Sequence, residues 1–164
     1  YGITFTAFPN TYGEAYDDYF EHMLQSFRFI RILVKPPTEV LEGENFTATV
    51  NADNVSDLAI LVFKLSYDSS VIELKEVEKG SDISNWSRWD SLRNPGAGIV
   101  KVFAFSDPSG APINGSAELV KLEFKVVGDA GNKSVLDIQG ILGNSDVESI
   151  RAIWMDSEVT ISRI

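Results

Sequence analysis

The chain has 164 residues, 44% of them apolar, which suits one compact domain with a buried core. Its 24 acidic and 14 basic residues give a net charge of −10, and this charge disfavours nucleic acids and anionic membranes as partners. With no Cys and one His, the sequence also excludes disulfides, thiolate metal sites and multi-histidine zinc sites. The composition therefore favours a surface that binds over a site that catalyses a reaction.

Residues 1–31 differ in pattern from the rest of the chain. Residues 1–8 alternate as a strand does, and Thr11 to Glu14 match a capping box. The apolar residues that follow recur every three or four positions, which predicts an amphipathic helix over 12–28. The lone His22 lies on this helix with no nucleophile motif beside it, which favours a structural role. We interpret 1–31 as the tail of a preceding domain, with packing on the main domain as the alternative.

From residue 30 onward the apolar period is two, as in β-strands. Turn-forming Gly, Pro, Asn and Asp separate the apolar runs, and an irregular stretch with two Trp occupies 78–98. Eight or nine short strands without alternating helices predict an all-β sandwich or barrel. The expected strands cover 30–34, 45–50, 58–67, 71–77, 99–105, 119–127, 134–142, 150–155 and 158–163.

The order of motifs along residues 32–164 resembles that of cohesin domains. In 41–83 a Gly-Glu precedes an alternating strand, a buried strand ends in Ser66-Tyr67-Asp68, and a Val-Ile-Glu-Leu strand follows. The second half agrees through NPGAGIVKVFAFSD at 94–107, LVKLEFKVVGDAG at 119–131 and a closing Val-Thr-Ile at 159–161. The resemblance implies a nine-stranded β-sandwich with jelly-roll topology over 32–164. It also implies a non-catalytic module, so no enzymatic activity is expected.

The same resemblance implies a partner, a calcium-loaded dockerin module on another protein. In the family that partner docks on one flat sheet face. Where the best-known cohesin type has an Asn and an Asp, this sequence has Ile60 and Val62, so recognition is expected to be more apolar, as in the second type. Calcium is expected on the dockerin, and no cofactor is expected for this chain. Carried over by position, the partner-binding residues are Leu58, Ile60, Val62, Lys64, Ser66, Val102, Ala104, Ser106 and Asp107.

The residues themselves single out the same strand. Alternate positions of 58–67 supply an inward set sufficient for a sandwich core: Ala59, Leu61, Phe63, Leu65 and Tyr67. A solvated opposite face should be polar, yet it begins with Leu58, Ile60 and Val62, and such a patch is typical of a covered or binding surface. The alternative occupants are the 12–28 helix and a second copy in a homodimer. A third interpretation is an architectural domain of a surface layer that associates with itself.

Two other kinds of site are considered. Trp86, Trp89 and Trp154 could stack on sugar rings, and a carbohydrate-binding β-sandwich that binds polysaccharide is therefore the alternative function. Acidic residues could hold structural Ca²⁺, but none follows an EF-hand register, and turn chemistry explains Asp68, Asp107 and Asp129 without a metal, so no metal site is predicted. The acids considered are Asp53, Asp57, Asp68, Asp82 and Asp90.

Five Asn-x-Ser/Thr sequons lie at or near expected strand ends and loops, which favours an exported glycoprotein. A secreted protein without Cys fits a prokaryotic cell surface better than a eukaryotic one. We therefore expect an extracellular or cell-surface location, in a larger protein connected with polysaccharide metabolism. The sequons begin at Asn45, Asn54, Asn85, Asn114 and Asn132.

Overall fold

A computed structural model describes residues 29–107 and 110–164, so the predicted strand 1–8 and the helix 12–28 with His22 lie outside the described residues. The all-β prediction is confirmed. In the described ranges no helix is long and apolar enough to cross a membrane. The elements in chain order are β1 (Arg31–Lys35), β2 (Val40–Leu41), β3 (Asn45–Ser66), β4 (Ile72–Lys79), η1 (Ser81–Ile83), β5 (Arg88–Asn94), η2 (Pro95–Ala97), β6 (Ile99–Phe105), β7 (Ile113–Val126), β8 (Lys133–Asn144), β9 (Ser149–Ile150), β10 (Ile153–Met155) and β11 (Ser157–Ser162).

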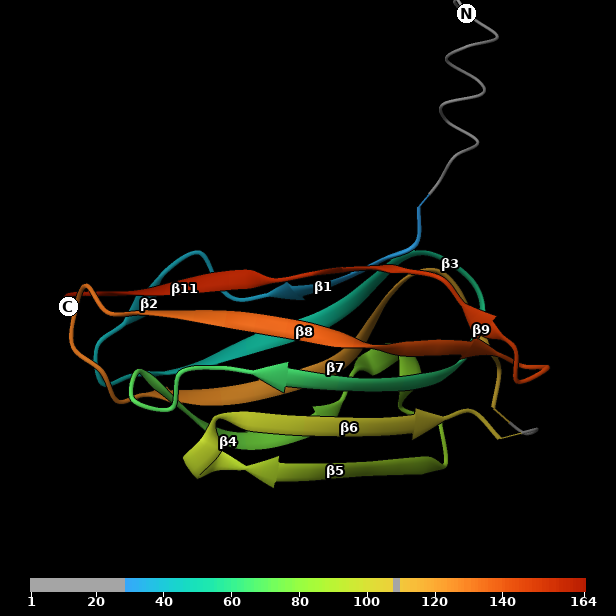
Figure 1. Ribbon diagram of the computed structural model, residues 1–164, viewed down its shortest axis with the longest axis horizontal. Helices are drawn as coiled ribbons and strands as arrows, with labels where there is room; N and C mark the ends of the chain where they lie inside the picture. Colours follow the sequence, from blue (N-terminus) through green and yellow to red (C-terminus); the bar gives the residue numbers. More distant parts are fainter. Residues whose placement is uncertain (1–28, 108–109) are drawn as a thin grey trace, which may run out of the picture.

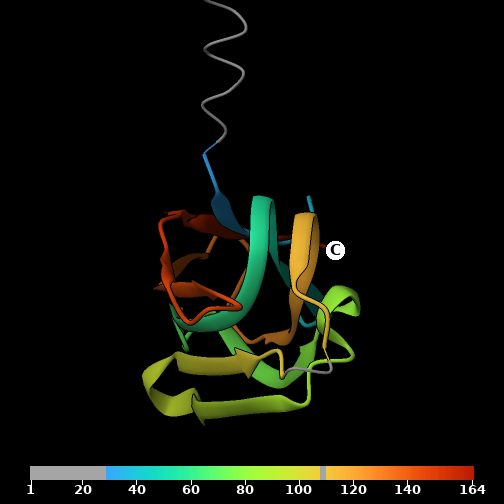
Figure 2. The ribbon, with the colours of Figure 1, turned by 90° about the vertical axis from the view of Figure 1, so that its right-hand side faces the viewer.

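The strands form two layers that share β3 (Figure 1). In its first half β3 pairs with β1 and β7, and β10 and β4 extend that layer. In its second half β3 pairs with β6 and β8, and β5 continues beyond β6. Viewed from the end, β3 curves from one layer into the other (Figure 2). The prediction of a sandwich is therefore confirmed, and residues of both layers enclose one core.

The long strand β3 joins two of the strands expected from the sequence, 45–50 and 58–67. The corner expected between them exists, but it lies within one continuous ladder. Register shifts follow Val50, Ala52 and Val55, and both Asn54 and Asp57 have positive φ. Asn and Asp tolerate this left-handed backbone better than most residues, which lets the strand bend there without ending.

The expected irregular stretch 78–98 contains a strand that the sequence pattern did not predict. Residues of β5 pair in register with all of β6, from Arg88 opposite Phe105 to Asn94 opposite Ile99. The strand RWDSLRN has few apolar residues because it lies at the edge of its layer, where most of its side chains are exposed. The structure has eleven strands among the described residues, against the nine expected. Two expected strands are one in β3, whereas β2, β5 and a third segment within 149–162 are additional.

Three aromatic side chains pack together in the core. The rings of Phe46 and Phe124 stack with centroids 5.4 Å apart, and Tyr67 meets Phe124 edge-on at 5.3 Å. Burial raises the pKa of the Tyr67 phenol above its ordinary value. Trp86 is fully buried, so the loop before β5 closes over one part of the core.

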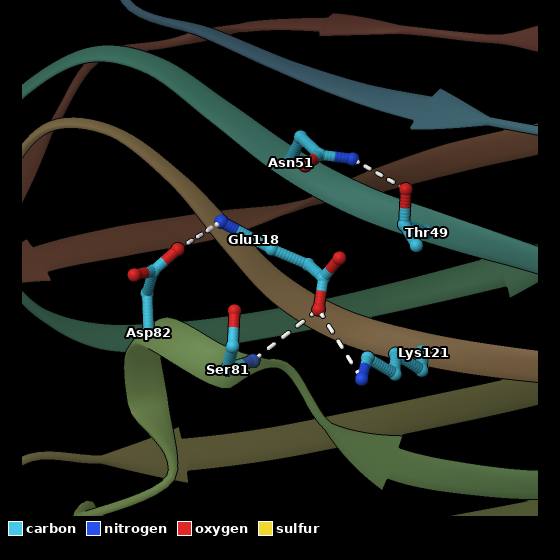
Figure 3. A network of polar contacts seen from close by, with 6 residues as sticks. All are labelled: Thr49, Asn51, Ser81, Asp82, Glu118 and Lys121. Atoms are coloured by element: carbon cyan, nitrogen blue, oxygen red, sulfur yellow. Dashed lines mark hydrogen bonds and ion pairs between the residues drawn. The ribbon is translucent and has the colours of Figure 1, made fainter.

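A polar network joins η1 to the neighbouring strand β7 where β4 ends (Figure 3). The Glu118 amide donates to Asp82 Oδ2 at 2.7 Å, and the Ser81 amide donates to Glu118 Oε1 at 3.3 Å. The same Glu118 carboxylate lies 3.7 Å from Lys121 Nζ. Beside it, Asn51 Nδ2 donates to Thr49 Oγ1 at 2.7 Å. These contacts give the layer of β3 and β7 a polar outer surface.

Gly98, at the end of η2, tests how closely the turn after β5 packs against the backbone of Tyr67. Gly98 has a φ of +62°, and a Cβ there would lie 2.0 Å from the Tyr67 carbonyl oxygen. We expect Gly98→Ala to lower the free energy of unfolding by about 2–4 kcal/mol, since backbone strain and steric overlap add. Gly96→Ala, in open space in the same turn, is the matched control and should change it by less than about 1 kcal/mol. Urea unfolding measures both, and equal effects would contradict this description.

Candidate interaction surface

Four neighbouring strands, in the order β8, β3, β6 and β5, present one outward face. The paired registers place their outward residues in rows across the strands. We call this surface the β8–β3–β6–β5 face. Its four rows are Gly143, Ile60, Phe105 and Arg88; Ile141, Val62, Phe103 and Asp90; Gln139, Lys64, Lys101 and Leu92; and Asp137, Ser66, Ile99 and Asn94.

The first two rows form an apolar band. Ile60 lies opposite Phe105, and Val62 lies between Phe103 and Ile141. Ile141 is 63% exposed and Phe105 is 36% exposed. A Cβ on Gly143 would lie 2.9 Å from Cδ1 of Ile60, so the absence of a side chain there leaves room for Ile60 to cover the neighbouring strand.

The outer surface of the other layer, formed by β3, β7 and β4, is polar in its central rows. Its ladders place polar or charged residues opposite one another across β3, β7 and β4. Solvated sheet faces usually have this composition, so the apolar band is a property of one layer only. The rows are Asn45, Lys125 and Glu73; Thr47, Glu123 and Glu76; and Thr49, Lys121 and Glu78.

Three shallow hollows adjoin one another on the β8–β3–β6–β5 face. One lies along β5, one lies between β3, β6 and β8, and one lies at the end of the face beside the loops. Phe103 lines the first two hollows, and Phe105 lines the first and third. The two aromatic rings therefore connect the hollows into one continuous surface.

The predicted residues Ser106 and Asp107 lie in the loop after β6, at the edge of this surface. The Ser106 hydroxyl donates to the Gly110 carbonyl at 2.6 Å. Asp107 accepts hydrogen bonds from the Ser87 hydroxyl and, at 3.0 Å, from the Gly110 amide. Both residues thus shape the loop, and Asp107 also lines two of the hollows.

The expected outward orientation is wrong for Leu58, Val102 and Ala104, which are fully buried in the core. A register irregularity between Leu58 and Ile60 adds one residue, so both Leu58 and Leu61 point inward. The strand β6 has the opposite alternation from the one expected, and its outward residues are Lys101, Phe103 and Phe105. The sequence reasoning missed the two Phe because both faces of β6 are apolar. The only polar residue of that strand, Lys101, was the signal that marks the exposed side.

Ile60, Val62, Lys64 and Ser66 do lie on the outward side of β3, each partly exposed, as expected. Whether they contact a partner stays a prediction.

The three Trp expected as a possible platform for sugars are not all exposed. Trp86 is fully buried. Trp89 lies opposite buried Ala104 and Trp154 lies opposite buried Ile32, and both pack partly against the core. The three Trp are therefore part of the sandwich interior or its margin and do not form one exposed surface.

Among the described residues no group of three or more His, Asp or Glu side chains could hold a metal ion. Hydrogen bonds from the hydroxyl and amide of Ser70 hold the pKa of Asp68 below its ordinary value. Each acid considered as a calcium ligand already has a partner. Asp53 forms an ion pair with Arg31 at 3.7 Å. The other four accept hydrogen bonds: Asp57 from Ser145, Asp68 from Ser70, Asp82 from the Glu118 amide and Asp90 from the Ser91 amide.

Comparison with known proteins gives one family. The sequence model of the cohesin domain family matches residues 34–161 of this chain. Among curated proteins no sequence is significantly similar to this chain.

Several solved structures share the fold. A non-cellulosomal cohesin from Archaeoglobus fulgidus superposes with a TM-score of 0.70 and 22% identity, covering 82% of this chain and 91% of that one. The OlpA cohesin of Clostridium thermocellum, solved in a type I complex with a dockerin, has a TM-score of 0.73 and 17% identity over 82% and 99% of the two chains. The sixth cohesin of Acetivibrio cellulolyticus scaffoldin B, in complex with a Cel5 dockerin mutant, gives 0.71 and 18% over 84% and 100%.

Two valines test the assignment of the two faces. We expect Val102→Asp to prevent folding or to destabilise it by more than about 4 kcal/mol, because the carboxylate would be buried without a partner. We expect Val62→Asp to leave the fold intact, at a cost of about 1 kcal/mol, because its side chain reaches solvent. Thermal unfolding followed by circular dichroism distinguishes them, and the reverse order would contradict the assignment.

Proposed function

The chain belongs to the cohesin family, and we propose that it binds a dockerin module of another protein through the β8–β3–β6–β5 face. Cohesin domains are non-catalytic protein–protein interaction modules, and the chain is accordingly not an enzyme. Several of the structures that share this fold are complexes of a cohesin with a dockerin. A partner of the same kind is the simplest occupant for the exposed apolar surface of this chain.

The observation that carries the proposal is the difference between the two outer surfaces. The β3–β7–β4 side is polar in all its central rows, whereas the β8–β3–β6–β5 side exposes Ile60, Val62, Phe103, Phe105 and Ile141 together. Contiguous exposed apolar surface is typical of binding sites on soluble domains. Burial of this band against a partner would supply the main part of the binding free energy.

The arrangement of the face fits an interface with an apolar centre and a polar rim. Phe103 and Phe105 join the hollows at the centre, and large aromatic side chains in such positions often dominate binding energy. Arg88, Asp90 and Asp107 lie around them. Polar groups at a rim set orientation and specificity more than affinity.

We also propose that the module acts outside the cell. The five sequon Asn residues are exposed or partly exposed, and each lies off the β8–β3–β6–β5 face. Glycans at these positions would leave the proposed binding face free. The intact mass of native protein should therefore exceed the sequence mass by hexose-type increments that peptide mapping assigns to some of these Asn residues. An unmodified mass would remove the glycan support for this location.

Binding itself is tested by pull-down with dockerin modules encoded in the same genome. We expect retention of at least one dockerin in calcium and its loss in a chelator, since the calcium would belong to the dockerin. Phe103→Ala should weaken binding at least about tenfold by truncating a central aromatic. Val62→Asp should weaken it similarly by placing a charge in the apolar centre.

The control variant is Thr49→Asp, an outward position on the polar surface of the other layer, opposite Lys121. It should bind as wild type does in isothermal titration calorimetry. Binding that survives Phe103→Ala and Val62→Asp but fails in Thr49→Asp would place the interface on the other side. Sedimentation of the free protein distinguishes the alternative occupant, a second copy in a homodimer.

A further inference from the structure

Two lysines face each other at the middle of the β8–β3–β6–β5 face. Lys64 of β3 and Lys101 of β6 are direct partners in the ladder, both on the outward side. Residues opposite one another in an antiparallel pair have Cβ atoms about 4.5–5.5 Å apart, and like charges there repel. Among residues 29–107 and 110–164, the side chains of Lys64 and Lys101 form no ion pair and no hydrogen bond.

This pair is unexpected in a chain of net charge −10, where acidic neighbours are abundant. The nearest acids in the ladders are Asp90, opposite Phe103, and Asp137, opposite Ser66, one row away on either side. Diagonal positions of this kind lie about 7–8 Å apart. Asp90 Oδ1 also accepts a hydrogen bond from the Ser91 amide at 2.8 Å. The two ammonium groups therefore have no carboxylate in contact on their own surface.

The lysines border a hollow whose other side chains are neutral. Besides Lys64 and Lys101, it is lined by the apolar side chains of Val62, Phe103 and Ile141 and by the Gln139 amide. Gln139 lies beside Lys64 in the same row. No carboxylate lines the hollow. The hollow therefore has two ammonium groups and one amide beside apolar side chains. This combination suits an anionic group that a partner presents among apolar side chains of its own.

We infer that Lys64 and Lys101 together bind a carboxylate of the partner, an Asp or Glu that the dockerin presents among apolar side chains. This inference rests on the proposed function and specifies the chemistry of its partner. A carboxylate between two ammonium groups makes charge-assisted hydrogen bonds and removes their mutual repulsion. When apolar side chains of the dockerin cover the hollow, they exclude water from it, and the contacts between carboxylate and ammonium groups become stronger. A partner with a basic residue at this point would be rejected.

Lysine-to-glutamine variants test the inference. K64Q and K101Q should each weaken binding of the dockerin retained by the wild type about three- to tenfold, and the double variant about thirtyfold or more. The matched control is K125Q, which removes the same charge from the polar outer surface of the other layer, opposite Asn45 and Glu73. Its affinity should stay within about twofold of wild type. On the dockerin, each Asp or Glu outside the calcium loops is replaced by its amide. One of these variants should weaken binding to the wild type but cause little further weakening when combined with K64Q, because the two residues form the same contact.

A second measurement needs no partner. Because the free lysines repel each other, K64Q and K101Q should unfold at the same temperature as the wild type or higher, while binding is weakened. Unfolding temperatures clearly lower for both would show a structural role and overturn the inference. If the double variant binds the dockerin as tightly as the wild type does, the inference is wrong and the proposed function stands. Failure of the wild type to retain any dockerin would overturn the proposed function, and self-association that depends on the lysines would assign the pair to a second copy instead.

Discussion

The arrangement of this domain depends on the path of β3. This one strand of 22 residues belongs to both layers, pairing with β1 and β7 in its first half and with β6 and β8 in its second. Each ladder fixes which residues of the neighbouring strands point inward. The extra residue between Leu58 and Ile60 sets the alternation of the second half, so that Leu61, Phe63 and Leu65 fill the core while Ile60, Val62 and Lys64 remain outside.

The same constraint produces the difference between the two outer surfaces. In the first half of β3 the outward residues are Asn and Thr, and their partners on β7 and β4 are charged. In the second half they are Ile and Val, and their partners on β6 are Phe103 and Phe105. Both halves contribute to one core, so folding alone requires no apolar residues on either outer side. An apolar band on one side only is explained by a surface that binds, and the two lysines in the row beside the band are the groups that we propose for a carboxylate of the partner.

Much of the fold could be predicted from the sequence because alternation and turn residues mark most strands directly. The edge strand β5 could not, because its exposed residues are polar and resemble a loop. On the candidate surface, Ile60, Val62, Lys64 and Ser66 were placed on the outward side correctly, whereas Leu58 was not, since a bulge leaves no signal in a run of apolar residues. In β6 both faces are apolar, so only the position of Lys101 distinguishes them. The close approach of Lys64 and Lys101 depends on the register between distant strands, which alternation within a strand does not specify.

Methyl NMR tests most directly whether a partner occupies the β8–β3–β6–β5 face, as we propose. In protein labelled at Ile, Leu and Val methyl groups, titration with a dockerin should shift the signals of Ile60, Val62, Leu92 and Ile141. The exposed methyl groups of Val127 and Ile153, which lie outside the rows of this face, should not change. Shifts concentrated at Val127 or Ile153, with Val62 and Ile141 unaffected, would show that the partner binds elsewhere.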